Sequence, residues 1–202
     1  MTKNILIIGA TGTLGRAVTE NTLETTDDKL TLFSRSASRI SLIDPSREKI
    51  ISGSVMVDAD LDRAVADQDA VFAALSGDLG AYAAKIIAAM SPNHVSRLVF
   101  ITSMGIYDEI PASVGTQGNL RFNPVLQTYR DAADEIEASN LDYTIVRPGW
   151  FTSGPVDYEV THKGEPFGGH DVSIASIADI VTKLLDDNTL YARDSTGINT
   201  PA

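Results

Sequence analysis

Apolar residues recur along this chain in short unbroken runs, and stretches with a helical period stand between the runs. The first run, residues 5–8, stops at a glycine, and nothing in it alternates polar with apolar positions. A run of this kind predicts a strand buried on both faces, as in a parallel sheet. Similar runs predict strands at residues 29–33, 50–53, 69–75, 97–101 and 141–147, and a short closing strand at 198–200.

The intervals between these runs carry the period of an amphipathic helix. They predict helices at residues 13–25, 61–66, 82–90, 129–139 and 173–185. Residues 104–123 and 150–171 show neither pattern, and long irregular stretches in a compact domain are usually binding loops or lids. The alternation of strand and helix predicts an α/β fold. Because repeats and linkers are absent from the sequence, we expect one domain over residues 1–202.

The turn after the first predicted strand carries the most informative motif. Gly9, Gly12 and Gly15 are spaced by three residues. We expect Gly9 to turn the chain out of the strand, Gly12 to let the backbone approach a ligand and Gly15 to let the helix pack closely. A glycine-rich turn without a ligand is the alternative, but the strand before and the helix after it favour a dinucleotide site. A Walker loop is excluded because the turn ends Leu14-Gly15-Arg16 rather than Gly-Lys-Ser/Thr.

The end of the second predicted strand bears on the choice of cofactor. Ser34 and Arg35 follow this strand, Arg39 comes one helical turn later, and no acidic residue occurs between Lys29 and Asp44. A carboxylate at this position would hold the 2′-hydroxyl of NAD, whereas arginine with small hydroxyl residues suits the 2′-phosphate of NADP. We therefore expect NADP(H) rather than NAD(H), with a solvated basic loop as the alternative.

The amino-acid composition limits which binding partners and which cellular compartment we expect. The chain has 202 residues, 43% of them hydrophobic and 21% charged, which is typical of a globular protein. Its formal net charge of −11 argues against nucleic acid and anionic membranes as partners. The sequence lacks cysteine, no apolar stretch approaches the ~20 residues of a membrane span, and the chain enters its first strand almost at once. We expect a cytoplasmic protein with a small-molecule partner, either a monomer or a homodimer.

The acidic run Asp58, Asp60 and Asp62 superficially resembles a calcium loop. Arg63 and Asp69 stand where such a loop needs glycine and glutamate, so no metal site is predicted. The acids are better explained as residues at the start of a helix, where its dipole favours negative charge.

Five motifs occur in the order found in the atypical short-chain dehydrogenase/reductases, and they extend over nearly the whole chain. They are residues 9–15 (GATGTLG), 53–55 (GSV), 72–77 (FAALSG), 99–103 (VFITS) and 143–149 (YTIVRPG). More narrowly, the chain resembles the NAD(P)H-binding, NmrA-like group that includes flavin- and biliverdin-reductase-like proteins. The resemblance implies a Rossmann-type, doubly wound parallel sheet with helices on both faces, a three-layer α/β/α architecture.

The resemblance also implies a set of cofactor contacts. The pyrophosphate is expected on the backbone of residues 11–14, and the 2′-phosphate on Ser34, Arg35 and Arg39. The adenine is expected near Ser54 and Val55, although the family usually has an aspartate in place of Ser54. The nicotinamide end is expected near Ala74, Leu75, Ser76, Ser103 and residues 148–151. The expected cofactor residues are thus Gly9, Thr11, Gly12, Thr13, Leu14, Gly15, Ser34, Arg35, Arg39, Ser54, Val55, Ala74, Leu75, Ser76, Pro148 and Gly149.

The chain departs from ordinary short-chain dehydrogenases in the residues expected for catalysis. Those enzymes protonate a carbonyl with a tyrosine assisted by a lysine four residues later. Here the residues four positions after Tyr82, Tyr107, Tyr129, Tyr143, Tyr158 and Tyr191 are Ile86, Pro111, Ala133, Arg147, His162 and Ser195. Tyr129 opens the helix that would normally carry the pair, but an unassisted tyrosine with a pKa of about 10 is a poor acid at neutral pH.

Two functions of different classes remain open. The first is a reductase in which NADPH passes a hydride to a flavin such as FMN or FAD, a quinone or a similar conjugated acceptor. The catalytic candidates are Ser103, which would orient the reactants, and Tyr129. The acceptor pocket would be lined by Tyr107, Trp150 and Phe151. For each aromatic side chain, packing in the core or in a loop is the alternative.

The second function is a non-catalytic NADP(H) sensor that reports redox state to a partner protein. NmrA-like regulators are similar in the cofactor half but usually longer, so the short chain favours the reductase. A nucleotide-sugar epimerase is a less favoured function still. Such an enzyme needs a substrate lobe and usually the tyrosine and lysine pair that this sequence lacks. His162 and His170 flank residues 164–169 as titrating groups or solvated loop residues, and His94 stands beside a helix end.

Overall fold

A computed structural model describes residues 2–201 of the chain, and its first strand shows how the apolar runs are used. Strand β1 (Asn4–Ile8) is buried at every position after Asn4. Leu6 and Ile8 belong to one hydrophobic cluster, and Ile5 and Ile7 belong to another. Because successive side chains of a strand point to opposite faces, an unbroken apolar run supplies two cores at once.

The central sheet has eight strands in the order β3-β2-β1-β4-β5-β6-β10-β8. All neighbouring pairs are parallel except β10 and β8, which pair antiparallel. The other strands are β2 (Lys29–Ser34), β3 (Glu48–Ser52), β4 (Ala70–Ala73), β5 (Arg97–Ile101), β6 (Asp142–Pro148), β8 (Glu159–Thr161) and β10 (Asp194–Asn199). Two short strands, β7 (Trp150–Thr152) and β9 (Asp171–Ser173), form a separate parallel pair.

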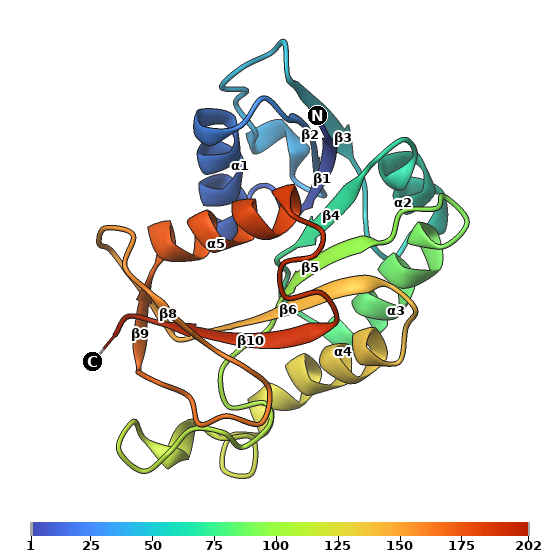
Figure 1. Cartoon of the computed structure of the whole chain (residues 1–202). Helices are drawn as coiled ribbons and strands as arrows, with labels where there is room; N and C mark the ends of the chain where they lie inside the picture. The colour runs from blue at the N-terminus through green and yellow to red at the C-terminus, as the bar shows by residue number, and fades with distance from the viewer. Residues whose placement is uncertain (1, 202) are drawn as a thin grey trace.

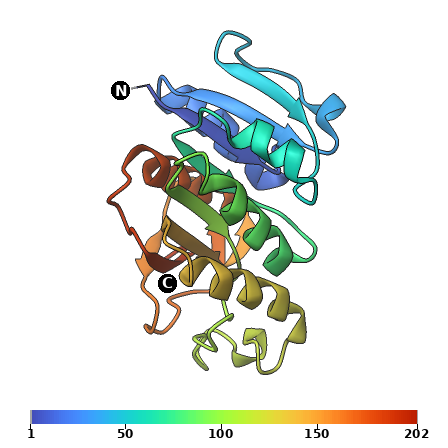
Figure 2. The same cartoon turned by 90° about the vertical axis from the view of Figure 1, so that its right-hand side faces the viewer.

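Helices cover both faces of the sheet and give three layers (Figure 1). Helix α1 (Thr13–Thr25) packs with α5 (Ile174–Asp186) on one face. On the other face α3 (Leu79–Met90) packs with α2 (Asp58–Val65) and α4 (Gln127–Glu137), as Figure 2 also shows. The predicted three-layer α/β/α fold is confirmed. None of the helices within residues 2–201 combines the length and apolar character needed to cross a membrane.

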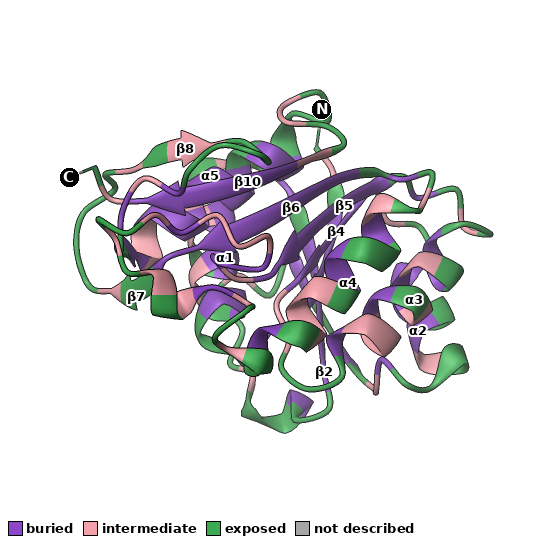
Figure 3. Ribbon diagram, turned by 90° about the horizontal axis from the view of Figure 1, so that it is seen from below, coloured by how far each residue is buried: buried purple, intermediate pink, exposed green. Residues whose placement is uncertain are grey.

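The order of the strands determines where a ligand binds. The chain moves outward from β1 through β2 to β3, then crosses back to place β4 on the other side of β1. This is the Rossmann order, and ligands of such sheets bind beyond the carboxyl ends of the strands, where the direction reverses. Figure 3 shows the central strands β4, β5, β6 and β10 as buried and much of the surrounding connecting chain as exposed.

Two regions differ from their predicted structure. Residues 150–171, expected to be irregular, contain β7 and β8 and reach the first residue of β9. The predicted closing strand is confirmed but is longer, because β10 already begins at Asp194. Ser195 and Thr196 near the start of β10 are polar yet buried, and β7, β8 and β9 have three residues each, so neither region shows a periodic apolar pattern. Residues 104–123 contain only the 3₁₀ turn Thr116–Gly118, as the irregular pattern predicts.

Candidate functional site: cavities along the carboxyl edge of the sheet

The turn from β1 into α1 has the geometry that its glycines predict. Gly9 has a φ of +90°, and a Cβ atom there would lie 2.1 Å from the carbonyl oxygen of Ala74 on the neighbouring strand end. A Cβ atom on Gly15 would lie 2.2 Å from the carbonyl oxygen of Gly9. Gly9 therefore makes the sharp turn, and Gly15 allows the close approach of helix to turn, as predicted.

Helix α1 begins at Thr13 with Gly12 as its N-cap, and no side chain caps it or places an acid in its first turn. The first N–H groups of a helix have no partner within the helix. Together with the helix dipole they favour an anion at this end. The start of α1 therefore has the N–H donors that a pyrophosphate site requires. It also has no carboxylate in its first turn that would compete for them.

A cavity of about 270 Å³ opens beside this helix start and extends across the carboxyl ends of β1 to β4. It is lined by Ile8, Gly9, Thr11, Gly12, Phe33, Ser34, Arg35, Gly53, Ser54, Val55, Met56, Ala74, Leu75, Ser76 and Tyr82. Ten of the expected cofactor residues therefore meet around one cavity. Phe33, Met56 and Tyr82 were not predicted; the close approach of Tyr82 to Gly77, 2.8 Å from the position of a Cβ atom, depends on tertiary packing.

The basic residues after β2 are divided between this cavity and its neighbour. Arg35 is exposed and lines this first cavity, whereas Arg39 lines a neighbouring cavity of about 330 Å³ together with Arg16. Thr11 lines both cavities. Ser34 is buried, and its Oγ lies 3.0 Å from Thr11 Oγ1 and accepts a hydrogen bond from the N–H of Ser36. The Ser34 hydroxyl therefore stabilises the loop that presents Arg35.

A second cavity, of about 410 Å³, lies where β5 and β6 end. It brings together the predicted residues Ser103, Tyr129, Pro148, Gly149, Trp150 and Phe151, and adds Thr102, Met104, Gly118, Asn123, Val125 and Leu126. Its wall contains large apolar side chains that are unusually exposed: Val125 at 74%, Trp150 at 63% and Phe151 at 47%. Apolar walls with few polar groups are typical of sites for small organic ligands.

A family model described as NAD(P)H-binding matches residues 9–188 of this chain. The chain belongs to this NAD(P)H-binding family. A Rossmann-fold NAD(P)-binding family protein from Shigella flexneri is 38% identical, with a TM-score of 0.87 over 100% of this chain and 95% of that one. A short-chain dehydrogenase/reductase from Veillonella parvula, solved in complex with NADP, is 29% identical, with a TM-score of 0.90 over 100% of this chain and 96% of that one.

These likenesses support an NAD(P)H-binding domain of the oxidoreductase type. The NmrA-like and flavin-reductase-like subgroup stays a prediction. Among residues 2–201 of this NAD(P)H-binding protein, no group of three or more His, Cys, Asp or Glu side chains is placed to hold a metal ion.

Tyr107, expected in the same pocket as Trp150 and Phe151, lies elsewhere. It is absent from the described residues that line the second cavity, and its hydroxyl donates to Glu137 Oε1 at 2.6 Å. Arg130, Arg147 and Lys163 stand 4.9, 5.3 and 4.5 Å from the centre of its ring. Burial, reinforced by the bond to Glu137, raises the pKa of Tyr107 above its ordinary value. The prediction that Tyr107 lines this pocket is wrong, because the chain after Ser103 folds back in a way that its sequence pattern does not encode.

A buried ion pair fixes this returning chain. The Arg147 side chain is fully buried on β6 and donates to Glu109 Oε1, to Ser195 Oγ at 3.1 Å and to the Ser195 carbonyl at 3.0 Å. The Glu109 carboxylate also accepts hydrogen bonds of 2.9 Å from the N–H groups of Gly105 and Tyr107. This pair was not predicted from the sequence, although an arginine inside an apolar run is a signal because buried charges are nearly always paired.

The two histidines beside residues 164–169, His162 and His170, are hydrogen-bonded to different acidic residues. His162 Nδ1 lies 2.5 Å from Asp194 Oδ2, and this hydrogen bond raises the pKa of His162. His170 Nδ1 lies 2.5 Å from Asp171 Oδ1, and its ring stacks on that of Trp150 with centroids 6.2 Å apart. His162 thus joins a loop to β10, whereas His170 supports the wall of the second cavity.

Proposed function

We propose that this protein is an NADPH-dependent reductase whose acceptor is a flavin, a quinone or a similar conjugated molecule. The observation that carries the proposal is the pair of neighbouring cavities on the carboxyl edge of the sheet. The first has the glycine turn and helix start that suit a dinucleotide, and the second has exposed aromatic walls at the next two strands. A flat conjugated acceptor is the ligand that such walls stabilise by stacking.

The chemistry of the first cavity, and of the neighbouring cavity that Arg39 lines, supports NADPH as the ligand. The start of α1 would hold the pyrophosphate, Ser54 and Val55 would border the adenine, and Arg35 with Arg39 would hold the 2′-phosphate. When bound, NADPH supplies the hydride. The role of the chain is to position both reactants and to exclude water between them.

This assignment does not require a strong proton donor from the chain. Ala133 lies buried one helical turn after Tyr129, at the place where a lysine would assist a tyrosine. Tyr129 then serves as a wall of the second cavity, and the Ser103 hydroxyl, which donates to the Met104 carbonyl at 3.1 Å, can turn to orient a reactant. A conjugated acceptor delocalises the charge that hydride transfer creates, so its reduction depends less on an acidic side chain.

NADPH oxidation by the purified protein tests the proposal, with a flavin, a quinone and a simple carbonyl compound as acceptors and a direct NADPH titration beside it. We expect turnover with the flavin or the quinone, little with the carbonyl, and a several-fold lower kcat/KM in Ser103→Ala. Tight NADPH binding without turnover of any acceptor would replace the reductase by a redox sensor. Carbonyl reduction as fast as flavin reduction would refute the proposed acceptor class.

A further inference from the structure

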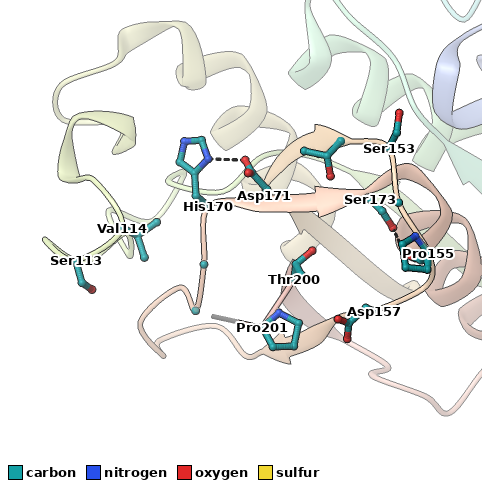
Figure 4. A pocket seen from close by; sticks show the side chains of 14 residues that line it. Ser113, Val114, Ser153, Pro155, Asp157, His170, Asp171, Ser173, Thr200 and Pro201 are labelled. Carbon is teal, nitrogen blue, oxygen red and sulfur yellow. Dashed lines mark hydrogen bonds and ion pairs between the residues drawn. The ribbon is translucent and has the colours of Figure 1, made fainter.

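A third cavity, of about 620 Å³, lies beyond the end of β10 and has no place in the function proposed so far. Its walls come from residues 113–114, from residues 152–155 and 157, from residues 168–171 and 173, and from Thr200 and Pro201 (Figure 4). Segments far apart in the sequence therefore enclose it together. It is larger than the first cavity, the second cavity and the neighbouring cavity that Arg39 lines.

The three cavities follow one another along the carboxyl edge. The cofactor cavity lies at β1 to β4, the second at β5 and β6, and the third beyond β10, in the order of the strands themselves. Strand β7 joins the last two, since Trp150 and Phe151 line the second cavity and Thr152 lines the third. The stack of Trp150 on His170 stands at their boundary, because His170 lines the third cavity. The second and third cavities therefore adjoin along β7.

The chemistry of the third cavity differs from that of the second. Thr152, Ser153 and Thr200 bring hydroxyl groups to its walls, and Asp157 and Asp171 bring carboxylates. Among the described residues that line it there is no lysine or arginine, and its one imidazole, His170, is hydrogen-bonded to Asp171. The hydroxyl groups can exchange hydrogen bonds with the hydroxyls of a ligand, whereas the two carboxylates repel a phosphate.

The cavity is small enough for the repulsion between its carboxylates and a phosphate to affect binding. A space of about 620 Å³ is roughly 9 Å across, so an anion inside it lies within about one Debye length of both carboxylates. At the longest of these separations, with salt screening, each carboxylate repels a doubly charged phosphate by an energy that corresponds to about twofold in affinity in a water-like dielectric. The repulsion is larger at shorter separations and in the lower effective dielectric of a protein cavity.

We infer that the third cavity holds the tail of the acceptor, and that this tail is uncharged and rich in hydroxyl groups rather than phosphorylated. The inference rests on the proposed function, which places the conjugated head of the same molecule in the second cavity. Asp157 and Asp171 are then specificity-determining residues, which exclude a phosphorylated tail without touching the reacting atoms.

Riboflavin and FMN are matched probes, because they share one ring system and differ only in the terminal phosphate. Quenching of flavin fluorescence by protein in excess NADP⁺ gives the affinity of each without requiring turnover. We expect riboflavin to bind at least about tenfold more tightly than FMN. In Asp157→Asn/Asp171→Asn the preference is expected to fall to about twofold or less, because the amides keep the shape and remove the charge. The variant Glu24→Gln/Asp27→Asn, at the opposite edge of the sheet, removes the same net charge and should keep the full preference.

Each outcome decides between the alternatives. Equal affinities, tighter FMN binding, no binding of either flavin, or a preference that persists in Asp157→Asn/Asp171→Asn would overturn the inference. A preference that Glu24→Gln/Asp27→Asn abolishes equally would assign it to the net charge of the molecule and overturn the inference as well. Riboflavin binding with the expected preference, but without NADPH oxidation, would refute the reductase and leave the tail site standing.

Discussion

At the scale of single residues, two adjacent side chains at the end of β2 have different roles. Ser34 is buried and its hydroxyl is engaged with Thr11 and the Ser36 N–H, so it stabilises the loop. Arg35 is exposed and lines the cavity proposed for the cofactor. Because a guanidinium forms strong, charge-assisted hydrogen bonds with phosphate, Arg35 is the residue on which the preference for NADPH over NADH should depend.

We expect Arg35→Asp to weaken NADPH binding by about tenfold to a hundredfold, the equivalent of one lost charge-assisted hydrogen bond. NADH, which lacks the 2′-phosphate, should lose less than about threefold. Titration of both cofactors measures the two effects. Lys29→Asp, at the other end of the same strand, makes the same change of charge and should leave the ratio of affinities unaltered. A parallel loss for NADPH and NADH would show that the 2′-phosphate lies elsewhere.

At the scale of elements, the ion pair of Glu109 and Arg147 fastens the chain after β5 to strands β6 and β10. Both side chains are almost completely buried, and the carboxylate also holds two backbone N–H groups of the chain that follows Ser103. Removing one partner of a buried pair leaves an uncompensated charge, which costs far more than the pair contributes.

Arg147→Met should therefore lower the free energy of unfolding by about 3–5 kcal/mol, as measured by urea denaturation. Arg121→Met is the matched comparison, because Arg121 pairs with Asp108 in the same segment but is largely exposed. An exposed pair contributes at most about 1 kcal/mol, so this variant should unfold close to the wild type. Equal losses in the two variants would contradict the anchoring role of Arg147.

The ion pair of Glu109 and Arg147 also shows which structural features can be predicted from the sequence and which cannot. The glycine turn, the strands up to β6 and the helices follow from local patterns, and so does the position of Arg35 after β2. Glu109 and Arg147 are 38 residues apart, and the three-residue strands β7, β8 and β9 show no period of their own. Tyr107 was misplaced for the same reason, since its neighbours Arg130, Arg147 and Lys163 meet only in the folded chain.

At the scale of the whole molecule, the antiparallel edge of the sheet gives stability a dependence on pH. His162 follows β8 and is hydrogen-bonded to Asp194 at the start of β10, so it ties the two strands together. The bond to Asp194 raises the pKa of His162 in the folded protein, and the charges of Asp194 and Glu165 act in the same direction. The protonated form therefore favours the folded state over the unfolded state.

The sign of the effect follows from this shift. The stabilisation by His162 is fully present below the pKa of the unfolded state, about 6.5, and is lost as pH rises through the higher pKa of the folded state. The gap in urea midpoint between the wild type and His162→Gln should therefore be larger at about pH 5.5 than at about pH 9. In an Asp194→Asn background the gap should lose most of this dependence on pH, because the main group that raises the pKa of His162 is gone and only the charge of Glu165 still raises it. A gap in the wild-type background that widens toward alkaline pH would mean that His162 contributes through its neutral ring, by packing against Tyr191, rather than through its charge.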